Sequence, residues 1–104
     1  MNTVISSEQF QTVINDATPT LVLFGSPTCP YCQREKPLVA AFGAKYPRIM
    51  TVFVDVTIWP EIASRRRVAT VPTMAVYRSG KQLQRAEGFH AAKEIETFVA
   101  GALS

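Results

Sequence analysis

The sequence predicts an α/β protein whose mixed central sheet has four or five strands and carries helices on both faces. Apolar runs at residues 20–24 and 49–54 have the continuous pattern of strands buried on both faces, and a helical segment separates them. Strands that are joined through helices pair in parallel. Two later runs, at 73–77 and 82–86, flank a turn that contains glycine and predict an antiparallel hairpin.

The helices follow from caps, apolar spacing and chain breakers. Ser6 and Ser7 are N-cap candidates for the first helix. Pro37 lies inside the second helix and should kink it, and Pro60 suits the first turn of the third. A short strand around residues 3–5 would make the fifth strand. The predicted helices cover about residues 7–16, 29–46, 60–67 and 91–103.

Length and composition favour a single domain over residues 1–104. The chain is 47% hydrophobic and 18% charged, which supports a packed core and argues against general disorder. No apolar run approaches the roughly 20 residues of a membrane span, and the N-terminus lacks the pattern of a secretory signal. We therefore expect a cytoplasmic protein in a reducing compartment, without a membrane partner.

The net charge of +3 comes largely from the run Arg65, Arg66 and Arg67 and from scattered lysines. This charge is too weak and too local to predict nucleic-acid binding, which needs a broader basic surface. We interpret the arginine run as a solvated helix face, with a docking patch for acidic partners as the alternative.

Cys29 and Cys32 are the two cysteines of the chain and lie where a strand passes into a helix. A structural zinc site needs four ligands, and the single histidine, His90, is distant in the sequence. A structural disulfide across so short a loop would constrain the unfolded chain by only about 2 kcal/mol. We therefore interpret Cys29-Pro30-Tyr31-Cys32 as a redox-active pair that needs no metal and no bound cofactor.

The two cysteines should have different roles. Cys29 is expected at the N-cap or in the first turn of the helix, where free N–H groups and the helix dipole favour an anion. It should therefore be the attacking thiolate. Cys32, one turn further along, should be more buried and should resolve the mixed disulfide by attacking Cys29.

The order of strand, Cys-Pro-Tyr-Cys motif, helix with Pro37 and Val71-Pro72-Thr73 resembles the thioredoxin superfamily over nearly the whole chain. This resemblance implies a thioredoxin fold. It also implies that Pro72 is cis and faces the cysteines, excludes metal from them, and places the preceding backbone where an extended substrate can pair. Thr70 and Val71 would then be substrate-binding residues.

Two subfamilies share features with the chain. The Cys-Pro-Tyr-Cys loop and residues 26–28 and 70–72 resemble glutaredoxins. Glutaredoxins also carry a glycine pair followed by acidic residues, whereas residues 87–91 contain Gly88 alone. The first helix, the last helix and the chain length resemble thioredoxins. We therefore expect a thioredoxin scaffold with a glutaredoxin-type active-site loop.

The chain departs from thioredoxins at the acid that serves the resolving cysteine. The buried aspartate of thioredoxins falls on Leu23, and its lysine partner falls on Thr51. The resemblance implies that this carboxylate assists proton removal. Without it, Cys32 would be deprotonated by solvent, by Cys29 or by a nearby group such as Glu35.

Other residues near the pair have less specific roles. Residues 55–60 contain an insertion relative to thioredoxins, and we expect its Trp59 to pack in the core, with a surface contact to a partner as the alternative. Gly88 is a second candidate for a surface contact. Tyr31 should be a half-exposed ring that shapes access, and His90 should be a surface residue at a helix start.

The leading functional hypothesis is a thiol–disulfide oxidoreductase that catalyses dithiol–disulfide exchange on protein disulfides. Its electrons would come from a flavoprotein reductase or from glutathione. The first alternative is a glutaredoxin-type enzyme that removes glutathione from proteins through Cys29 alone. The second is a non-catalytic binding subunit with the same fold. We expect a monomer, because both cysteines serve one site.

Overall fold

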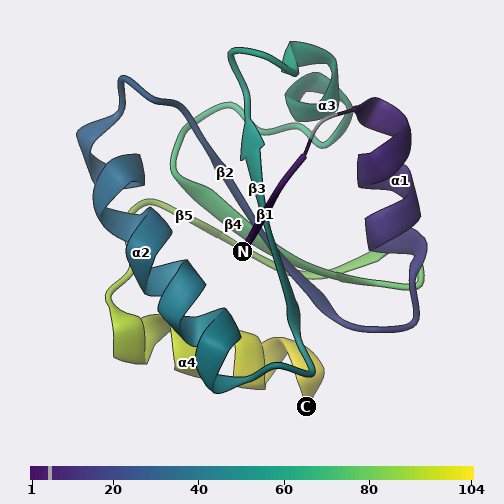
Figure 1. Ribbon diagram of the computed structural model, residues 1–104, viewed down its shortest axis with the longest axis vertical. Helices are drawn as coiled ribbons and strands as arrows, with labels where there is room; N and C mark the ends of the chain where they lie inside the picture. The colour runs from purple at the N-terminus through teal and green to yellow at the C-terminus, as the bar shows by residue number, and fades with distance from the viewer. Residues whose placement is uncertain (5) are drawn as a thin grey trace.

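The computed structural model describes residues 1–4 and 6–104, which form one sheet with helices packed on it (Figure 1). In chain order the elements are β1 (Asn2–Thr3), α1 (Ser7–Asn15), β2 (Thr20–Gly25), α2 (Pro30–Lys45), β3 (Met50–Asp55), α3 (Pro60–Arg65), β4 (Thr73–Arg78), β5 (Lys81–Glu87) and α4 (Ala92–Leu103). Among the described residues, no helix has the length and apolar character needed to cross a membrane.

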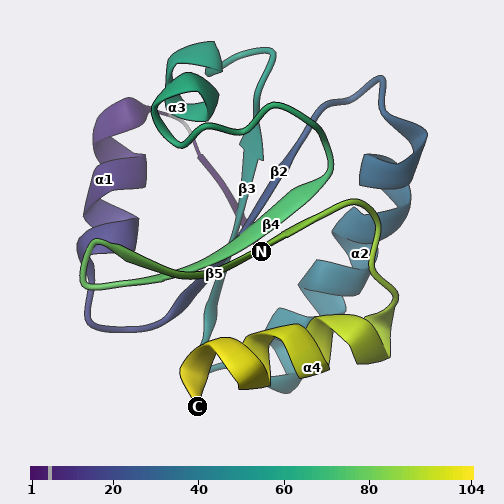
Figure 2. The ribbon, with the colours of Figure 1, turned by 180° about the vertical axis from the view of Figure 1, so that it is seen from behind.

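The strands lie in the order β1-β3-β2-β4-β5. β3 pairs in parallel with β1 and β2, whereas β4 pairs antiparallel with β2 and β5. Figures 1 and 2 show α1 and α3 on one face of the sheet and α2 and α4 on the other. The predicted α/β fold, a mixed sheet between two layers of helices, is thereby confirmed.

Most elements lie close to their predicted positions. Ser6 caps α1 with its side chain, and α2 runs through Pro37 as one helix. β1 covers Asn2–Thr3, and residue 5 of the predicted first strand lies outside the described residues. α3 is shorter than predicted because Arg67 has a φ of +57°, a left-handed conformation that cannot continue a helix.

The arginine run is not a uniformly solvated face. Arg65 is exposed at the end of α3, but Arg66 is half-buried. Its guanidinium carbon lies 5.5 Å from the ring centroid of Phe10 and 5.6 Å from that of Tyr77. The guanidinium of Arg85 donates a hydrogen bond to the backbone carbonyl of Arg66. The middle arginine therefore packs on the core, which the run of charges did not predict.

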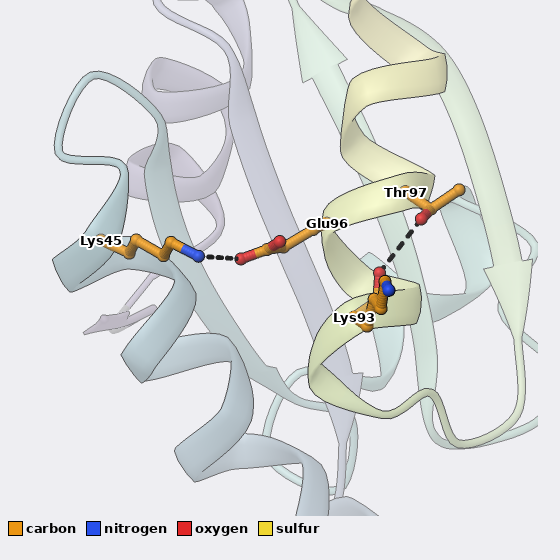
Figure 3. A network of polar contacts seen from close by, with 4 residues as sticks. All are labelled: Lys45, Lys93, Glu96 and Thr97. Carbon is orange, nitrogen blue, oxygen red and sulfur yellow. Dashed lines mark hydrogen bonds and ion pairs between the residues drawn. The ribbon is translucent and has the colours of Figure 1, made fainter.

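Apolar clusters fill both faces of the sheet and fix the helices on it. The cluster under α2 and α4 contains Leu21, Leu23, Val39, Phe42, Phe53, Met74, Val76, Ile95 and Val99. At the far end of α2, the Lys45 ammonium lies 2.8 Å from the Glu96 carboxylate of α4, and Thr97 donates to the Lys93 carbonyl within α4 (Figure 3). The Lys45 side chain is exposed and the Glu96 side chain is partly exposed, so water screens this pair. The packing of α2 on α4 therefore depends on the apolar cluster.

The register of the sheet gathers several connections at one edge. β2 and β3 end together, with Gly25 opposite Asp55. Phe24 pairs with Thr73 at the start of β4, and Thr73 pairs with Glu87 at the end of β5. The segments that follow β2, β3 and β5 therefore meet the segment that precedes β4.

Candidate active site

Cys29 is the N-cap residue of α2 and is half-buried. Its Sγ accepts a hydrogen bond from the backbone N–H of Cys32 at 3.2 Å and lies 3.8 Å from the carbonyl oxygen of Val71. The N–H groups of the first helical turn and the helix dipole favour a negative charge at this place. The position suits a thiolate that attacks a disulfide.

Cys32 lies one turn further along α2 and is fully buried. A Cβ atom on Gly25 would come within 3.1 Å of its sulfur, so a side chain there would require the neighbouring groups to shift by a few tenths of an ångström. Burial raises the pKa of Cys32 to about 12, the hydrogen bond with Cys29 and the charges of Cys29 and Glu35 act in the same direction, and a backbone hydrogen bond from Ser26 opposes them. At neutral pH Cys32 is therefore a protonated thiol, and the two cysteines are chemically unequal.

The segment before β4 faces the cysteines. The Val71–Pro72 peptide bond is cis, and Pro72 is buried. The Gly88 N–H donates to the Pro72 carbonyl at 2.9 Å, and Gly88 has a φ of +88°, which favours glycine. Thr70 is exposed at the rim. The chain thus brings Thr70, Val71, Pro72 and Gly88 together beside the redox pair.

The Tyr31 ring, between the two cysteines in the sequence, lies near the segment before α4. Tyr31 is 56% exposed, and its ring centroid lies 6.1 Å from that of Phe89, in the segment before α4. The Arg34 guanidinium lies 5.8 Å from the Tyr31 centroid and 5.1 Å from the Phe89 centroid, within the range of cation–π attraction. Pro30, at the start of α2, is also exposed. The Arg34 cation therefore lies over the rings of both Tyr31 and Phe89.

Trp59 points into the fold. Its indole N–H donates to the Val4 carbonyl at 3.2 Å, and its half-buried ring packs against the apolar cluster on the α1 and α3 face. The neighbouring Ile58 is 62% exposed. These contacts favour a packing role for Trp59 over a partner contact.

The buried carboxylate near the cysteines comes from α2. The strand positions are occupied by Leu23 and Thr51, which are both buried and carry neither a carboxylate nor an ammonium group. Glu35 is 0% exposed, and its Oε1 accepts a hydrogen bond from the backbone N–H of His90 at 3.2 Å. Its Oε2 has no partner among the described residues. The sequence predicted Glu35 as a group near Cys32 but did not predict its burial, because glutamate is rarely buried without a partner. The burial follows from the tertiary packing.

His90 also differs from a plain surface residue. It is half-buried just before α4, and its ring Nδ1 lies 2.9 Å from the Gly88 carbonyl oxygen. The His90 backbone links the segment after β5 to Glu35 on α2.

Comparison with known proteins identifies the family. The thioredoxin family model matches residues 2–101. The chain belongs to the thioredoxin family. The thioredoxin of Porphyra purpurea is 32% identical over 74 residues, which cover 70% of this chain and 69% of that protein. The structure of Plasmodium falciparum thioredoxin has the same fold, with a TM-score of 0.90 at 21% identity over 97% of this chain and 98% of that chain.

A glutaredoxin is also among the relatives. Glutaredoxin 3 of Danio rerio is 26% identical over 88 residues, which cover 83% of this chain and 27% of that protein. The chain thus spans about a quarter of the length of the glutaredoxin-3 relatives it matches. Thioredoxin-family members are generally thiol–disulfide oxidoreductases that work with a reductase or with glutathione. The predicted resemblance to the thioredoxin superfamily is confirmed.

Proposed function

We propose that this protein is a thiol–disulfide oxidoreductase that reduces or isomerises protein disulfides through Cys29 and Cys32. The observation that carries the proposal is the inequality of the two sulfurs. Cys29 is half-buried at a helix N-terminus and receives an N–H donor, whereas Cys32 beside it is a fully buried thiol. The Cys29 sulfur is suited to attack a substrate, and the Cys32 sulfur is suited to resolve the mixed disulfide from inside the protein.

The reaction has two exchange steps. The Cys29 thiolate attacks one sulfur of the substrate disulfide, so a Cys29–substrate bond forms and the first substrate thiolate leaves. Cys32 then loses its proton and attacks Cys29, which forms the Cys29–Cys32 disulfide and releases the second thiolate. Two electrons pass to the substrate. We propose that an extended substrate segment pairs with the backbone of Val71, which lies beside Cys29, and that Thr70 and Pro72 also contact the substrate.

A reductant must then restore the dithiol. We propose that a flavoprotein reductase or glutathione supplies the two electrons and that the protein works as a cytoplasmic monomer without a bound cofactor. The Cys29–Cys32 dithiol itself carries the two electrons, so no further group is needed for the exchange.

The second candidate function is glutathione-dependent removal of glutathione from proteins. The Cys-Pro-Tyr-Cys loop and the similarity to Glutaredoxin 3 favour it. In this reaction the Cys29 thiolate attacks the mixed disulfide, the protein thiol leaves, and a second glutathione reduces Cys29 and departs as glutathione disulfide. Cys32 is not required.

The activities of the Cys32→Ser variant distinguish the two functions. We expect the wild-type protein to reduce insulin disulfides with dithiothreitol as the electron source, and Cys29→Ser to be inactive in every assay. Cys32→Ser should lose insulin reduction under the first function and keep glutathione-dependent deglutathionylation under the second. A variant with both cysteines replaced by Ala that kept full biological function would contradict both and indicate a binding subunit.

A further inference from the structure

We propose that Glu35 accepts the proton of Cys32 in the resolving step, from a place on α2 rather than from strand β2. The proposal rests on the proposed dithiol exchange, because it concerns the second of its two steps. The residue at the strand position, Leu23, has no group that can accept a proton.

The geometry places a free acceptor beside a thiol that must lose its proton. Cys32 and Glu35 are three positions apart on one helix, so their side chains lie on the same face. Both are fully buried. The hydrogen bond from the His90 backbone to Oε1 holds the carboxylate, while Oε2 has no partner among residues 1–4 and 6–104. Buried carboxylates are normally paired, so an unpartnered oxygen on the same helix face as Cys32 requires a physical explanation.

The chemistry needs such an acceptor. The attack needs the Cys32 thiolate, whereas burial keeps Cys32 protonated at neutral pH. Burial excludes bulk water from the sulfur, so exchange with solvent is a poor substitute. A positioned base typically contributes about 10²- to 10⁴-fold to a step of this kind.

The charges around Glu35 suit a base. Burial raises the pKa of its carboxyl above the ordinary 4.5. The His90 N–H and the positive charge of the His90 ring lower it, and the negative charge of Glu94 raises it. The balance is a raised pKa, which brings the carboxyl nearer to the pH at which it must work.

The mixed disulfide brings the two groups closer in proton affinity. In the dithiol, the hydrogen bond and the charge of Cys29 both raise the pKa of Cys32. Once Cys29 is bonded to the substrate it carries no charge, so both effects are removed. The proton of Cys32 then passes to Glu35, the Cys32 thiolate attacks the Cys29 sulfur, and the substrate leaves as a thiolate. Glu35 afterwards returns the proton to solvent.

Stopped-flow reaction with one equivalent of 5,5′-dithiobis(2-nitrobenzoate) resolves the two steps. Attack by Cys29 releases the first chromophore in a second-order phase, and resolution by Cys32 releases the second in a first-order phase. Glu35→Gln keeps an oxygen for the His90 N–H but cannot take up a proton. We expect its first-order phase to slow by about tenfold or more, with the second-order phase unchanged. Glu8→Gln, which removes an exposed carboxylate from α1 on the opposite face of the sheet, should leave both phases unchanged.

The sign of the effect is decisive. The negative charge of Glu35 raises the pKa of Cys32, so a purely electrostatic role predicts that Glu35→Gln makes resolution faster. A folded Glu35→Gln protein with an unchanged or faster first-order phase would overturn the proposal. Failure of the wild type to reduce insulin, or loss of neither phase in Cys29→Ser, would instead overturn the proposed function.

The wild-type pH profile gives a test that does not depend on folding of the variant. Resolution should accelerate as Glu35 ionises and then level off well below the pKa of Cys32. A rate that rises in proportion to hydroxide with no plateau would refute the role of Glu35. His90→Gln keeps the backbone N–H that holds Glu35, so the rate of resolution in this variant should still level off. A variant whose rate shows no plateau would indicate that the His90 ring, and not Glu35, is the base, and would refute the proposal.

Discussion

Glu35 should make the protein less stable as the pH rises. Its pKa in the folded state lies above the ordinary 4.5, so below pH 4.5 the carboxyl is neutral in both the folded and the unfolded chain and costs nothing. As the pH rises through the folded pKa, the folded protein must hold a buried charge that the unfolded chain gives to water. Stability is therefore present at low pH and lost over that window.

Glu35→Gln removes this loss. The free energy of unfolding of the variant should exceed that of the wild type at pH 8, because the neutral amide places no charge in the interior at that pH. Each unit by which the folded pKa exceeds the ordinary value widens the gap by about 1.4 kcal/mol. The charge of Glu94 raises the folded-state pKa of Glu35 and so widens the pH range over which stability is lost. The hydrogen bond and charge of His90 lower that pKa and narrow the range.

Urea denaturation of the reduced proteins, followed by circular dichroism from pH 4 to pH 8, measures the gap directly. In thermal unfolding, each kcal/mol should appear as a Tm difference of about 4–8 °C for a domain of this size. Glu8→Gln is the control for the loss of one carboxylate, and it should show no comparable gain. A gap that does not change with pH, or a wild type more stable than Glu35→Gln at pH 8, would refute the reasoning.

Three further predictions concern the surroundings of the pair. Gly25→Ala should lower the free energy of unfolding in urea titrations by about 1–3 kcal/mol. The reason is that the added Cβ would lie 3.0 Å from the Phe53 ring and 3.1 Å from the Cys32 sulfur. An unchanged free energy of unfolding would show that the strand end can shift. The redox potential against glutathione should lie between about −200 and −250 mV, because the Pro30-Tyr31 loop and a strand without an acid make the pair more oxidising; a value below about −270 mV would contradict this. Trp59→Ala should lower the Tm but leave the insulin-reduction rate of the folded protein unchanged, and a specific loss of rate would favour a substrate contact.

The two predictions for Glu35 have opposite directions, and this separates function from stability. Removing the carboxylate should stabilise the fold and slow the resolving step. A residue retained only for packing would show the reverse of the first effect and none of the second. Such a trade between stability and activity is expected where a site keeps a strained or unsatisfied group.

Much of the fold could be predicted from local patterns. The apolar runs at 20–24 and 49–54 became the central strands because a strand buried on both faces requires a continuous apolar sequence. The hairpin around Gly80 and the final helix followed from turn and periodicity signals. The predicted end of α3 was too late, because arginine is not a residue type that signals the left-handed turn found at Arg67.

The sequence by itself determined the redox pair, since two cysteines three positions apart before a helix leave few other chemistries open. It also predicted Cys29 at the N-cap or in the first turn of the helix, and the structure makes it the N-cap residue. Only the tertiary structure decided where the accompanying carboxylate lies. Helical spacing puts Glu35 on the same face as Cys32, but whether that face meets water or the sheet depends on how α2 packs against α4 and the strands. That packing buries Glu35 and leaves one of its oxygens without a partner among the residues that the structure describes. It thereby makes an ordinary helix residue a candidate base for the resolving cysteine.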